Sequence, residues 1–348
     1  MFIIGDKQLH HPFDKEPLLR EEGDESGGED STLEMLKSCS MKSSMSLYEN
    51  KIRHLPKSVF LVMGVFCFAI CFGVDQYRQS MRECTDVLAD CSHIPFSQIL
   101  VPPFYNYVEL FAITKTRDIS LCVLPKVMST TGTATLCYIN DPEKFTADNR
   151  TISTEKYHTR FCKNSPVFSY SMVKHQLSKN FDNIIITRDP YDRFISGFTD
   201  KCVNDIAKNF CHGCGTDMRC FLRKEYRQLM RISSTSKYTT ADVHFAPQTW
   251  YCDMQNNLKN STVIRFSLKG IEKEKMIDDM LNLFRKKKVA ERHLDVVREQ
   301  LSLGKSHHTT TGTSLREEYE RIVREDGSIR RALQRIYYYD FLLLGYDM

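Results

Sequence analysis

The chain has 348 residues and a mass of 40.6 kDa, enough for one large folded domain or two small ones. Its 41% hydrophobic and 26% charged content is typical of a folded protein. The net charge of +4 is too small to favour nucleic-acid binding, so no nucleic acid is expected as a partner. A local basic pocket for a phosphate-bearing ligand is compatible with this charge.

The first part of the chain, residues 1–57, is polar and acidic and contains few aromatic side chains. Such a segment cannot bury enough apolar surface to order itself, so we expect a disordered cytosolic tail. An uncharged apolar run follows at residues 58–74, close to the lower limit of length for a membrane-spanning helix. It begins too deep in the chain for a secretory signal peptide and lacks a small-residue cleavage pattern. We therefore predict a single transmembrane signal-anchor helix, with a buried core helix as the alternative.

Basic residues crowd the N-terminal side of this run, at Lys51, Arg53 and Lys57, whereas its other flank mixes both charges. The positive-inside rule then places about 270 residues on the far side of the membrane, which is single-pass type II topology. A short span also fits the thinner membranes of the early secretory pathway. Two N-x-[ST] sequons, at Asn149 and Asn260, lie on the predicted lumenal side as expected glycosylation sites.

Ten of the 13 cysteines follow the predicted span, and in an oxidising lumen we expect several of them to form disulfides. One cluster has an alternative interpretation as a zinc site, because it contains a C-x2-C step and a histidine. It lacks the second matched pair of a zinc ribbon, which favours disulfides. The residues concerned are Cys202, Cys211, His212, Cys214 and Cys220.

Residues 75–115 contain prolines and little periodicity, and we interpret them as a lumenal stem. From residue 116 to the C-terminus, apolar strand-like runs alternate with helical patterns. This alternation predicts an α/β fold over 116–348, with a parallel sheet flanked by helices. Strands are expected at 119–124, 183–187 and 262–266, and helices after Thr131, after Pro190 and over 272–288.

The stretch NIIITRDPYDRFISGF, residues 183–198, ends an apolar strand on Arg188. Asp189 is a good N-cap and Pro190 a good first helical residue, so a helix should begin there. Ligands of parallel α/β sheets bind at the carboxyl ends of the strands, where helix N-termini supply free backbone donors. Arg188 and Ser196, which lies two turns into the helix, would then surround one phosphate. The alternative is that Arg188 only pairs with a nearby carboxylate.

A second strand-to-helix junction carries Pro125 and Lys126, followed by the hydroxyl-rich turn Ser129, Thr130 and Thr131. A loop of small side chains with free amide groups, one lysine and a helix behind it is suited to an anion. The G-x-x-x-x-G-K-[ST] order of a Walker A loop is absent, and nothing resembles its acidic magnesium-binding partner. An ordinary P-loop kinase is therefore disfavoured.

Together the two junctions resemble the membrane-bound Golgi carbohydrate sulfotransferases of the chondroitin and dermatan 4-O type. That family carries a Pro-Lys-Val-x-[SC]-[ST] loop for the 5′-phosphosulfate of the donor PAPS (3′-phosphoadenylyl sulfate). An Arg-[DE]-Pro-[FY]-x-Arg-[FL]-[IV]-Ser segment binds its 3′-phosphate. The resemblance assigns donor binding to Pro125, Lys126, Val127, Met128, Ser129, Thr130, Thr131, Arg188, Asp189, Pro190, Tyr191, Asp192, Arg193 and Ser196.

Two later stretches are similar to the same family in the same order, DVHFAPQTWYC at residues 242–252 and IYYYDFLLLGYD at residues 336–347. The resemblance therefore covers residues 121–348. One departure concerns the Asn-Trp-Lys that usually follows the first loop. It reads Thr131-Gly132-Thr133 here, which removes an aromatic ring and a second cation.

The resemblance implies a PAPS-dependent sulfotransferase with a P-loop-like fold, anchored in the Golgi membrane, whose lumenal domain sulfates a glycan acceptor without a metal. Charge builds on the leaving phosphate during sulfuryl transfer, and Lys126 with the loop amides would stabilise it. The acceptor hydroxyl also needs a base, for which His244, oriented by Asp242, is the candidate. A structural role for His244 is the alternative. His307 and His308 are further candidates for the base or the cofactor pocket, but a polar surface loop is the favoured interpretation of their segment.

A homodimer is possible. Two other functions are also compatible with these sequence features. The missing Trp-Lys pair motivates a non-catalytic lumenal protein that binds a nucleotide or a glycan on the same fold. A nucleotide kinase with an unusual loop is the third possibility. Binding of adenosine 3′,5′-bisphosphate would separate the first two from the kinase, and sulfate transfer would separate the enzyme from the binding protein.

Overall fold

The structure is a computed structural model, and it describes residues 86–89, 91, 96–105, 107–156, 158–162, 166–205, 210–235, 239–303 and 313–348. The chain divides into two compact units, Met1–Arg82 and Glu83–Met348, and every described residue belongs to the second. The predicted tail at 1–57 and the predicted span at 58–74 lie outside the described residues. No helix in the described part of the chain is long and apolar enough to cross a membrane.

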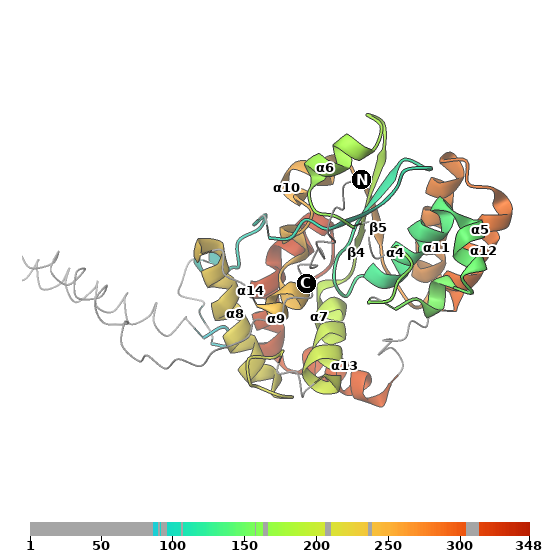
Figure 1. The fold of residues 1–348 in the computed structure, drawn as a ribbon. Coiled ribbons are helices and arrows are strands. Elements are labelled where there is room, and N and C mark those ends of the chain that lie inside the picture. The colour runs from blue at the N-terminus through green and yellow to red at the C-terminus, as the bar shows by residue number, and fades with distance from the viewer. Residues whose placement is uncertain are drawn as a thin grey trace, which may run out of the picture. The chain divides into compact units, whose positions relative to one another are not determined.

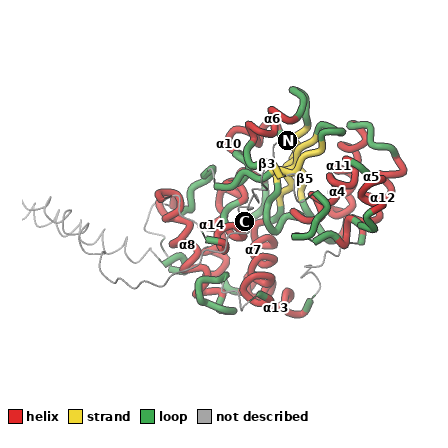
Figure 2. Tube along the Cα trace, viewed as in Figure 1, coloured by secondary structure: helices red, strands yellow, loops and turns green. Residues whose placement is uncertain are grey.

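The described strands form one five-stranded sheet in the order β3-β1-β2-β4-β5. Figure 1 and Figure 2 show it in the middle of this unit, with helices on both sides. β2, β4 and β5 are parallel to one another, whereas β1 is antiparallel to both of its neighbours, β2 and β3. The strand bounds are Phe111–Thr114 (β1), Ile119–Cys122 (β2), Pro166–Val167 (β3), Asp182–Thr187 (β4) and Thr262–Arg265 (β5).

The prediction of a parallel sheet is right for the three strands β2, β4 and β5 and wrong for the other edge. Only residues 115–118 join β1 to β2, which is too short for a crossover, so the two strands pair as an antiparallel hairpin. β1 also precedes residue 116 and lies in the stretch that the sequence predicted as stem. Phe111 of this strand is fully buried. All described residues of that stretch, from 86 onward, therefore belong to the folded unit, and Val87 near its start is fully buried as well.

Helices cover both faces of the sheet because the central strands are apolar on both faces, and the last five residues of β4 are all buried. Figure 1 shows α4, α5, α11 and α12 grouped on one side, and α7, α8, α9 and α14 on the other. The helix bounds are Ser129–Asn140 (α4), Pro142–Ala147 (α5), Tyr170–Gln176 (α6), Pro190–Phe198 (α7), Met218–Thr235 (α8), Thr240–Phe245 (α9), Met254–Asn257 (α10), Gly270–Lys286 (α11), Glu291–Ser302 (α12), Ser314–Glu325 (α13) and Gly327–Leu344 (α14).

Short helical turns complete the fold. They are the π-helix η3 (Thr199–Asn204), which continues α7, and the 3-10 turns η1 (Phe96–Ile99), η2 (Ile152–Thr154), η5 (Gln248–Trp250) and η6 (Leu258–Asn260).

Disulfides cross-link the folded unit, which confirms the expected pairing of several cysteines. Cys91 is disulfide-bonded, and the pairs between described cysteines are Cys122–Cys252, Cys137–Cys162, Cys202–Cys211 and Cys214–Cys220. The interpretation of the last four cysteines as zinc ligands is therefore wrong, since their sulfur atoms are bonded to one another. Cys122–Cys252 is also important for the site, because it joins the end of β2 to the segment 242–252.

Candidate active site

The two strand-to-helix junctions leave the sheet next to each other. β2 and β4 are parallel neighbours, and their register places Cys122 opposite Ile185. Three residues further along each strand come Pro125 and Arg188. Both junctions therefore start at the same carboxyl edge, the place where parallel α/β sheets bind ligands.

The first junction presents backbone donors that no side chain caps. Lys126 and Met128 have left-handed backbone conformations, with φ of 66° and 57°, which turn the chain sharply into α4. Met128 is the N-cap residue of α4, and its side chain makes no capping hydrogen bond. The Gly132 N–H donates to the Met128 carbonyl over 2.7 Å and so closes the first helical turn. The preceding N–H groups, those of Ser129 and Thr130 among them, have no intrahelical acceptor and can bind an anion.

The departure from the Asn-Trp-Lys pattern has a packing explanation in this chain. A Cβ atom on Gly132 would lie 2.9 Å from Leu121 Cδ2 and 3.9 Å from Ile186 Cδ1, so α4 approaches β2 and β4 closely at this point. Thr133 is buried as well. These two positions pack inside the fold, and a tryptophan at 132 would collide with the sheet.

Lys126 is held by an acidic residue from the continuation of α7. Its Nζ donates to Asp200 Oδ2 over 2.5 Å, and Lys201 Nζ lies 3.1 Å from the same oxygen. Burial lowers the pKa of Lys126 to about 8, against the opposing effect of Asp200. Burial by itself would raise the pKa of Asp200, but the two lysines lower it to about 2. At neutral pH Lys126 is therefore protonated and Asp200 is ionised.

The second junction caps itself with its own side chain. Asp189 accepts a hydrogen bond from the Asp192 N–H over 2.9 Å, and Pro190 is the first residue of α7, which confirms the predicted helix start. Arg188 is buried, and its Nε donates to Asp192 Oδ2 over 2.6 Å. Its guanidinium also lies 4.9 Å from the centre of the Phe266 ring. The carboxylate considered as an alternative partner for Arg188 is thus Asp192.

Arginines of the second junction bind the backbone of the first one directly. Arg188 Nη1 donates to the Lys126 carbonyl over 2.8 Å, and Arg193 Nε donates to the Pro125 carbonyl over 3.2 Å. Hydrogen bonds from charged donors are stronger than those between neutral groups, and both guanidinium groups are shielded from water. The two junctions therefore form one connected surface at the edge of the sheet.

The two later stretches, 242–252 and 336–347, are linked to the second junction by hydrogen bonds. The side-chain amide of Gln248 accepts from the Arg188 N–H over 2.9 Å and donates to the Arg188 carbonyl over 2.8 Å. The Asp340 carboxylate accepts from the backbone N–H groups of Gln248 and of the next residue, over 2.7 and 3.0 Å. All four stretches that the sequence singled out thus meet around Arg188.

Comparison with protein families gives the same region. A family model described as "Sulfotransferase family" matches residues 109–347, which include all four of these stretches. The chain belongs to the sulfotransferase family. Among its relatives in Caenorhabditis elegans is vep-2, provisionally named a sulfotransferase, which is 36% identical over 219 residues, or 60% of this chain and 67% of that protein. Carbohydrate sulfotransferase chst-1 is 29% identical over 259 residues, covering 71% and 78% of the two chains. No solved structure gives a significant match.

Several side chains predicted to bind the donor have structural roles in this member of the family. Val127 is buried, and the Tyr191 ring packs against an aromatic ring of α14 with centres 4.8 Å apart. Asp192 forms ion pairs with both Arg188 and Arg316. Burial raises the cost of charging Asp192, but these two arginines dominate and lower its pKa. These residues shape the junctions, and their side chains are occupied by the protein itself.

The remaining predicted site residues lie on α7 and α9. Ser196 is half-buried on α7, one helical turn before Asp200, the partner of Lys126. His244 is half-buried on α9. Asp242, expected to orient His244, instead takes part in a capping box with Thr239 at the start of α9. His307 and His308 lie outside the described residues.

Sequence reasoning missed three residues that organise the site: Asp200, Gln248 and Asp340. Asp200 carries a local signal, because it follows Ser196 by four positions and so shares its helical face. Gln248 and Asp340 are 92 residues apart, and no local pattern predicts their contact. The two sequons, Asn149 and Asn260, are both exposed, and their glycosylation stays a prediction.

Proposed function

We propose that the protein is a PAPS-dependent carbohydrate sulfotransferase, which transfers a sulfuryl group to a hydroxyl of a glycan in the Golgi lumen. The hydrogen bond from Arg188 Nη1 to the Lys126 carbonyl, 2.8 Å long, carries this proposal. A nucleotide with anionic groups at its 3′ and 5′ ends needs two clusters of donors at a fixed separation. This bond fixes one cluster against the other.

The groups at the two junctions have the chemistry that such a donor substrate requires. Nearly all of them are hydrogen-bond donors, and the carboxylates beside them are already paired with cations. PAPS, when bound, supplies the sulfuryl group and leaves as adenosine 3′,5′-bisphosphate. The residues proposed to contact it are Lys126, Ser129, Thr130, Thr131, Arg188 and Ser196.

Lys126 and the start of α4 would act on the 5′ end of the donor. Negative charge develops on the leaving phosphate during in-line transfer, and fixed donors aimed at that charge lower the barrier. The Lys126 ammonium is protonated at neutral pH, and Lys126 precedes the uncapped start of α4 by three residues. The N-cap residue Met128 makes no side-chain hydrogen bond that an anion would have to displace.

Arg188 and Ser196 would bind the 3′-phosphate, far from the bond that breaks. Binding energy at a remote group of the substrate serves to place the reacting atoms. Arg188 suits this purpose because Asp192, the Lys126 carbonyl and Gln248 already fix its position. Its role is then positioning, whereas the role of Lys126 is catalytic.

His244 is the proposed general base for the acceptor hydroxyl. His244 lies on α9, which packs closely against α7. A Cβ atom added to Gly197 of α7 would lie only 2.8 Å from the ring of Phe245 on α9. Two residues beyond His244, the Ala246 carbonyl accepts from Arg193 Nη1 over 2.8 Å. The end of α9 is therefore fixed to α7, the helix that bears Arg193 and Ser196 and that begins directly after Arg188 and Asp189.

The proposed compartment and acceptor rest on chemistry and on one relative. Nine described cysteines are disulfide-bonded, as expected of a protein that folds in an oxidising lumen. The predicted anchor at 58–74 would hold this domain at the Golgi membrane as a type II protein. The name of the relative chst-1 specifies a carbohydrate acceptor, and we extend that class to this chain.

The test is transfer of radiolabelled sulfate from PAPS to a panel of glycosaminoglycans and glycoproteins by the full-length chain in detergent. We expect label in at least one acceptor, and none with Lys126→Ala. Lys144→Ala, which removes an exposed lysine of α5, is the matched control and should transfer normally. Binding of adenosine 3′,5′-bisphosphate without transfer to any acceptor would instead identify a non-catalytic binding protein. Absence of both binding and transfer would contradict the proposal.

A further inference from the structure

A cluster of metal-ligating side chains lies outside the proposed donor site. His212, Glu225 and Asp242 each offer one ligand atom, and these atoms lie within 4.8 Å of one another. They come from three segments, namely the loop before α8, α8 itself and α9. Glu225 is 1% exposed and Asp242 is 0% exposed. The two carboxylates are therefore enclosed by protein, whereas His212 is half-buried.

Two oxygen atoms of this cluster are left without hydrogen bonds. Glu225 Oε1 and Asp242 Oδ1 are buried and have no partner among the described residues. The other oxygen of each carboxylate is used, since Glu225 Oε2 lies 2.7 Å from His212 Nε2 and Asp242 Oδ2 accepts from the Thr239 N–H. Carboxylate oxygens without a partner are costly to bury, and a bound cation removes that cost.

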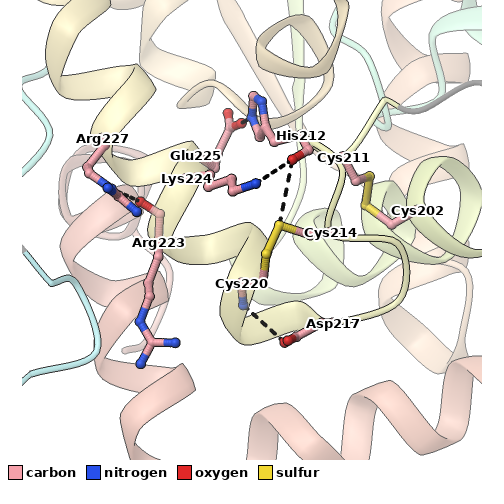
Figure 3. The surroundings of a disulfide bond; sticks show 10 residues. All are labelled: Cys202, Cys211, His212, Cys214, Asp217, Cys220, Arg223, Lys224, Glu225 and Arg227. Carbon is pink, nitrogen blue, oxygen red and sulfur yellow. Dashed lines mark hydrogen bonds and ion pairs between the residues drawn. A yellow bond between two sulfur atoms is a disulfide. The ribbon is translucent and has the colours of Figure 1, made fainter. Parts of the chain in front are cut away.

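The imidazole is held in place by the covalent framework around it. His212 follows the disulfide Cys202–Cys211 and precedes Cys214–Cys220, and its φ of 54° is left-handed. Figure 3 shows the ring directed at Glu225 on α8, with both disulfides alongside. A fixed ligand loses little conformational freedom when it binds an ion, which favours binding.

We propose that His212, Glu225 and Asp242 bind one divalent transition-metal ion, with Zn²⁺ as its first candidate. One imidazole nitrogen and carboxylate oxygens are ligands that zinc accepts in tetrahedral sites. Neighbouring ligand atoms of such a site lie roughly 3.3 Å apart. The pair His212–Glu225, now at 2.7 Å, would open slightly as the ion replaces the shared proton, and Asp242 would move inward.

The ion would fasten α9 to α8 and to the disulfide-linked loop. The His212 ring stacks on Phe221, with centres 5.7 Å apart, and Phe221 lies 4.6 Å from Phe245 of α9. Phe245 in turn packs against Gly197 of α7. The proposed role is structural, and it depends neither on PAPS nor on sulfuryl transfer.

The experiment uses the full-length chain, purified in detergent with a tag that contains no histidine. The protein is stripped with a chelator and titrated with Zn²⁺, with metal content and melting temperature measured together. We expect about one equivalent of tightly bound Zn²⁺ and a higher melting temperature with the ion. Glu225→Gln and Asp242→Asn keep the shape of each side chain and should weaken binding by more than about tenfold. Glu272→Gln and His175→Gln, at exposed sites on α11 and α6, are matched controls.

The wild-type titration decides the question even where a variant fails to fold. A Co²⁺ spectrum of the wild type without thiolate charge transfer supports the site, and a thiolate band assigns the ion to cysteines and overturns it. Mn²⁺ bound in place of Zn²⁺, and lost in both variants, supports it as well. Wild-type protein that binds none of Zn²⁺, Co²⁺ and Mn²⁺ overturns the proposal. So does a Glu225→Gln variant that binds Zn²⁺ like the wild type.

Discussion

The N-termini of α4 and α7 leave the same edge of the sheet, yet they are built differently. α4 starts after the left-handed Met128 with no side-chain cap, whereas Asp189 caps α7 and Pro190 occupies its first position. An open helix N-terminus binds anions through its own N–H groups. A self-capped one has no such groups left and must use side chains. Under the proposed function, one end of the donor would therefore meet backbone amides and Lys126, and the other would meet Arg188.

The two cations also differ in how firmly the protein holds them. Lys126 binds a single carboxylate, Asp200, through a flexible side chain. Arg188 binds Asp192 and the Lys126 carbonyl and lies against the Phe266 ring. A lysine ammonium is a compact charge on a rotatable stem, whereas a guanidinium held by several partners is suited to placement. Under the proposed function, catalysis would fall to the first junction and positioning to the second.

The largest expected effect comes from Lys126→Ala, which removes the cation from the catalytic junction. We expect kcat/KM for PAPS to fall by about 10²–10³-fold, as when one donor to a developing oxyanion is removed. Steady-state kinetics with a sulfated-glycan assay would measure it. A change in KM alone, at unchanged kcat, would show that Lys126 binds ground state and transition state equally and would end the contrast with Arg188.

Arg188→Lys should have the next largest effect, and on binding more than on kcat. A lysine keeps the charge but cannot bind Asp192 and the Lys126 carbonyl with one planar fork. We expect affinity for adenosine 3′,5′-bisphosphate to fall about 10- to 100-fold, the cost of one or two charge-assisted bonds. Calorimetric titration would measure it, with Arg321→Lys on the exposed face of α13 as control. An affinity equal to wild type would remove Arg188 from the proposed site.

Ser196→Ala should weaken the same ligand about three- to tenfold, because one neutral hydrogen bond is lost. The exposed Ser171→Ala on α6 is the control. If both variants bound adenosine 3′,5′-bisphosphate with equal affinity, Ser196 would have no part in binding the 3′-phosphate, and Arg188 would remain as its proposed ligand.

Asp200→Asn should have the smallest effect at neutral pH and a clear effect on the pH profile. Asp200 raises the pKa of Lys126, which is about 8, so loss of its charge lowers that pKa further. The active form carries the Lys126 proton, hence wild-type kcat/KM should decline above pH 8 or so and the variant should decline at lower pH. A pH–rate profile with Glu272→Gln as charge control would show it. An alkaline limb that moves upward, or stays in place, would contradict the assigned role of Asp200.

Local chemistry predicted the junctions because their signals are short-range. The apolar run of β4, the cap Asp189 and Pro190 lie within a few residues of one another, and α7 begins where they indicated. The hydroxyl-rich turn after Lys126 likewise became the start of α4.

The parts that the sequence did not reveal depend on distant partners or very short elements. β1 has four residues and β3 only two, too few for any periodicity, so the antiparallel edge went unseen. The contacts of Gln248 with Arg188 and Asp340 join residues 60 and 92 positions apart. The zinc interpretation of the cysteine cluster was wrong because spacing does not distinguish bonded sulfur atoms from free thiols. Gly132 could be understood only once Leu121 and Ile186 were seen against it.

The central claim is that the two junctions bind opposite ends of one nucleotide. The most direct test is calorimetric titration of adenosine 3′-phosphate and adenosine 5′-phosphate into Lys126→Ala and Ser196→Ala. The account predicts that Lys126→Ala weakens only the 5′-phosphate and Ser196→Ala only the 3′-phosphate. Equal losses for both ligands in each variant, or wild-type protein that binds neither, would contradict it.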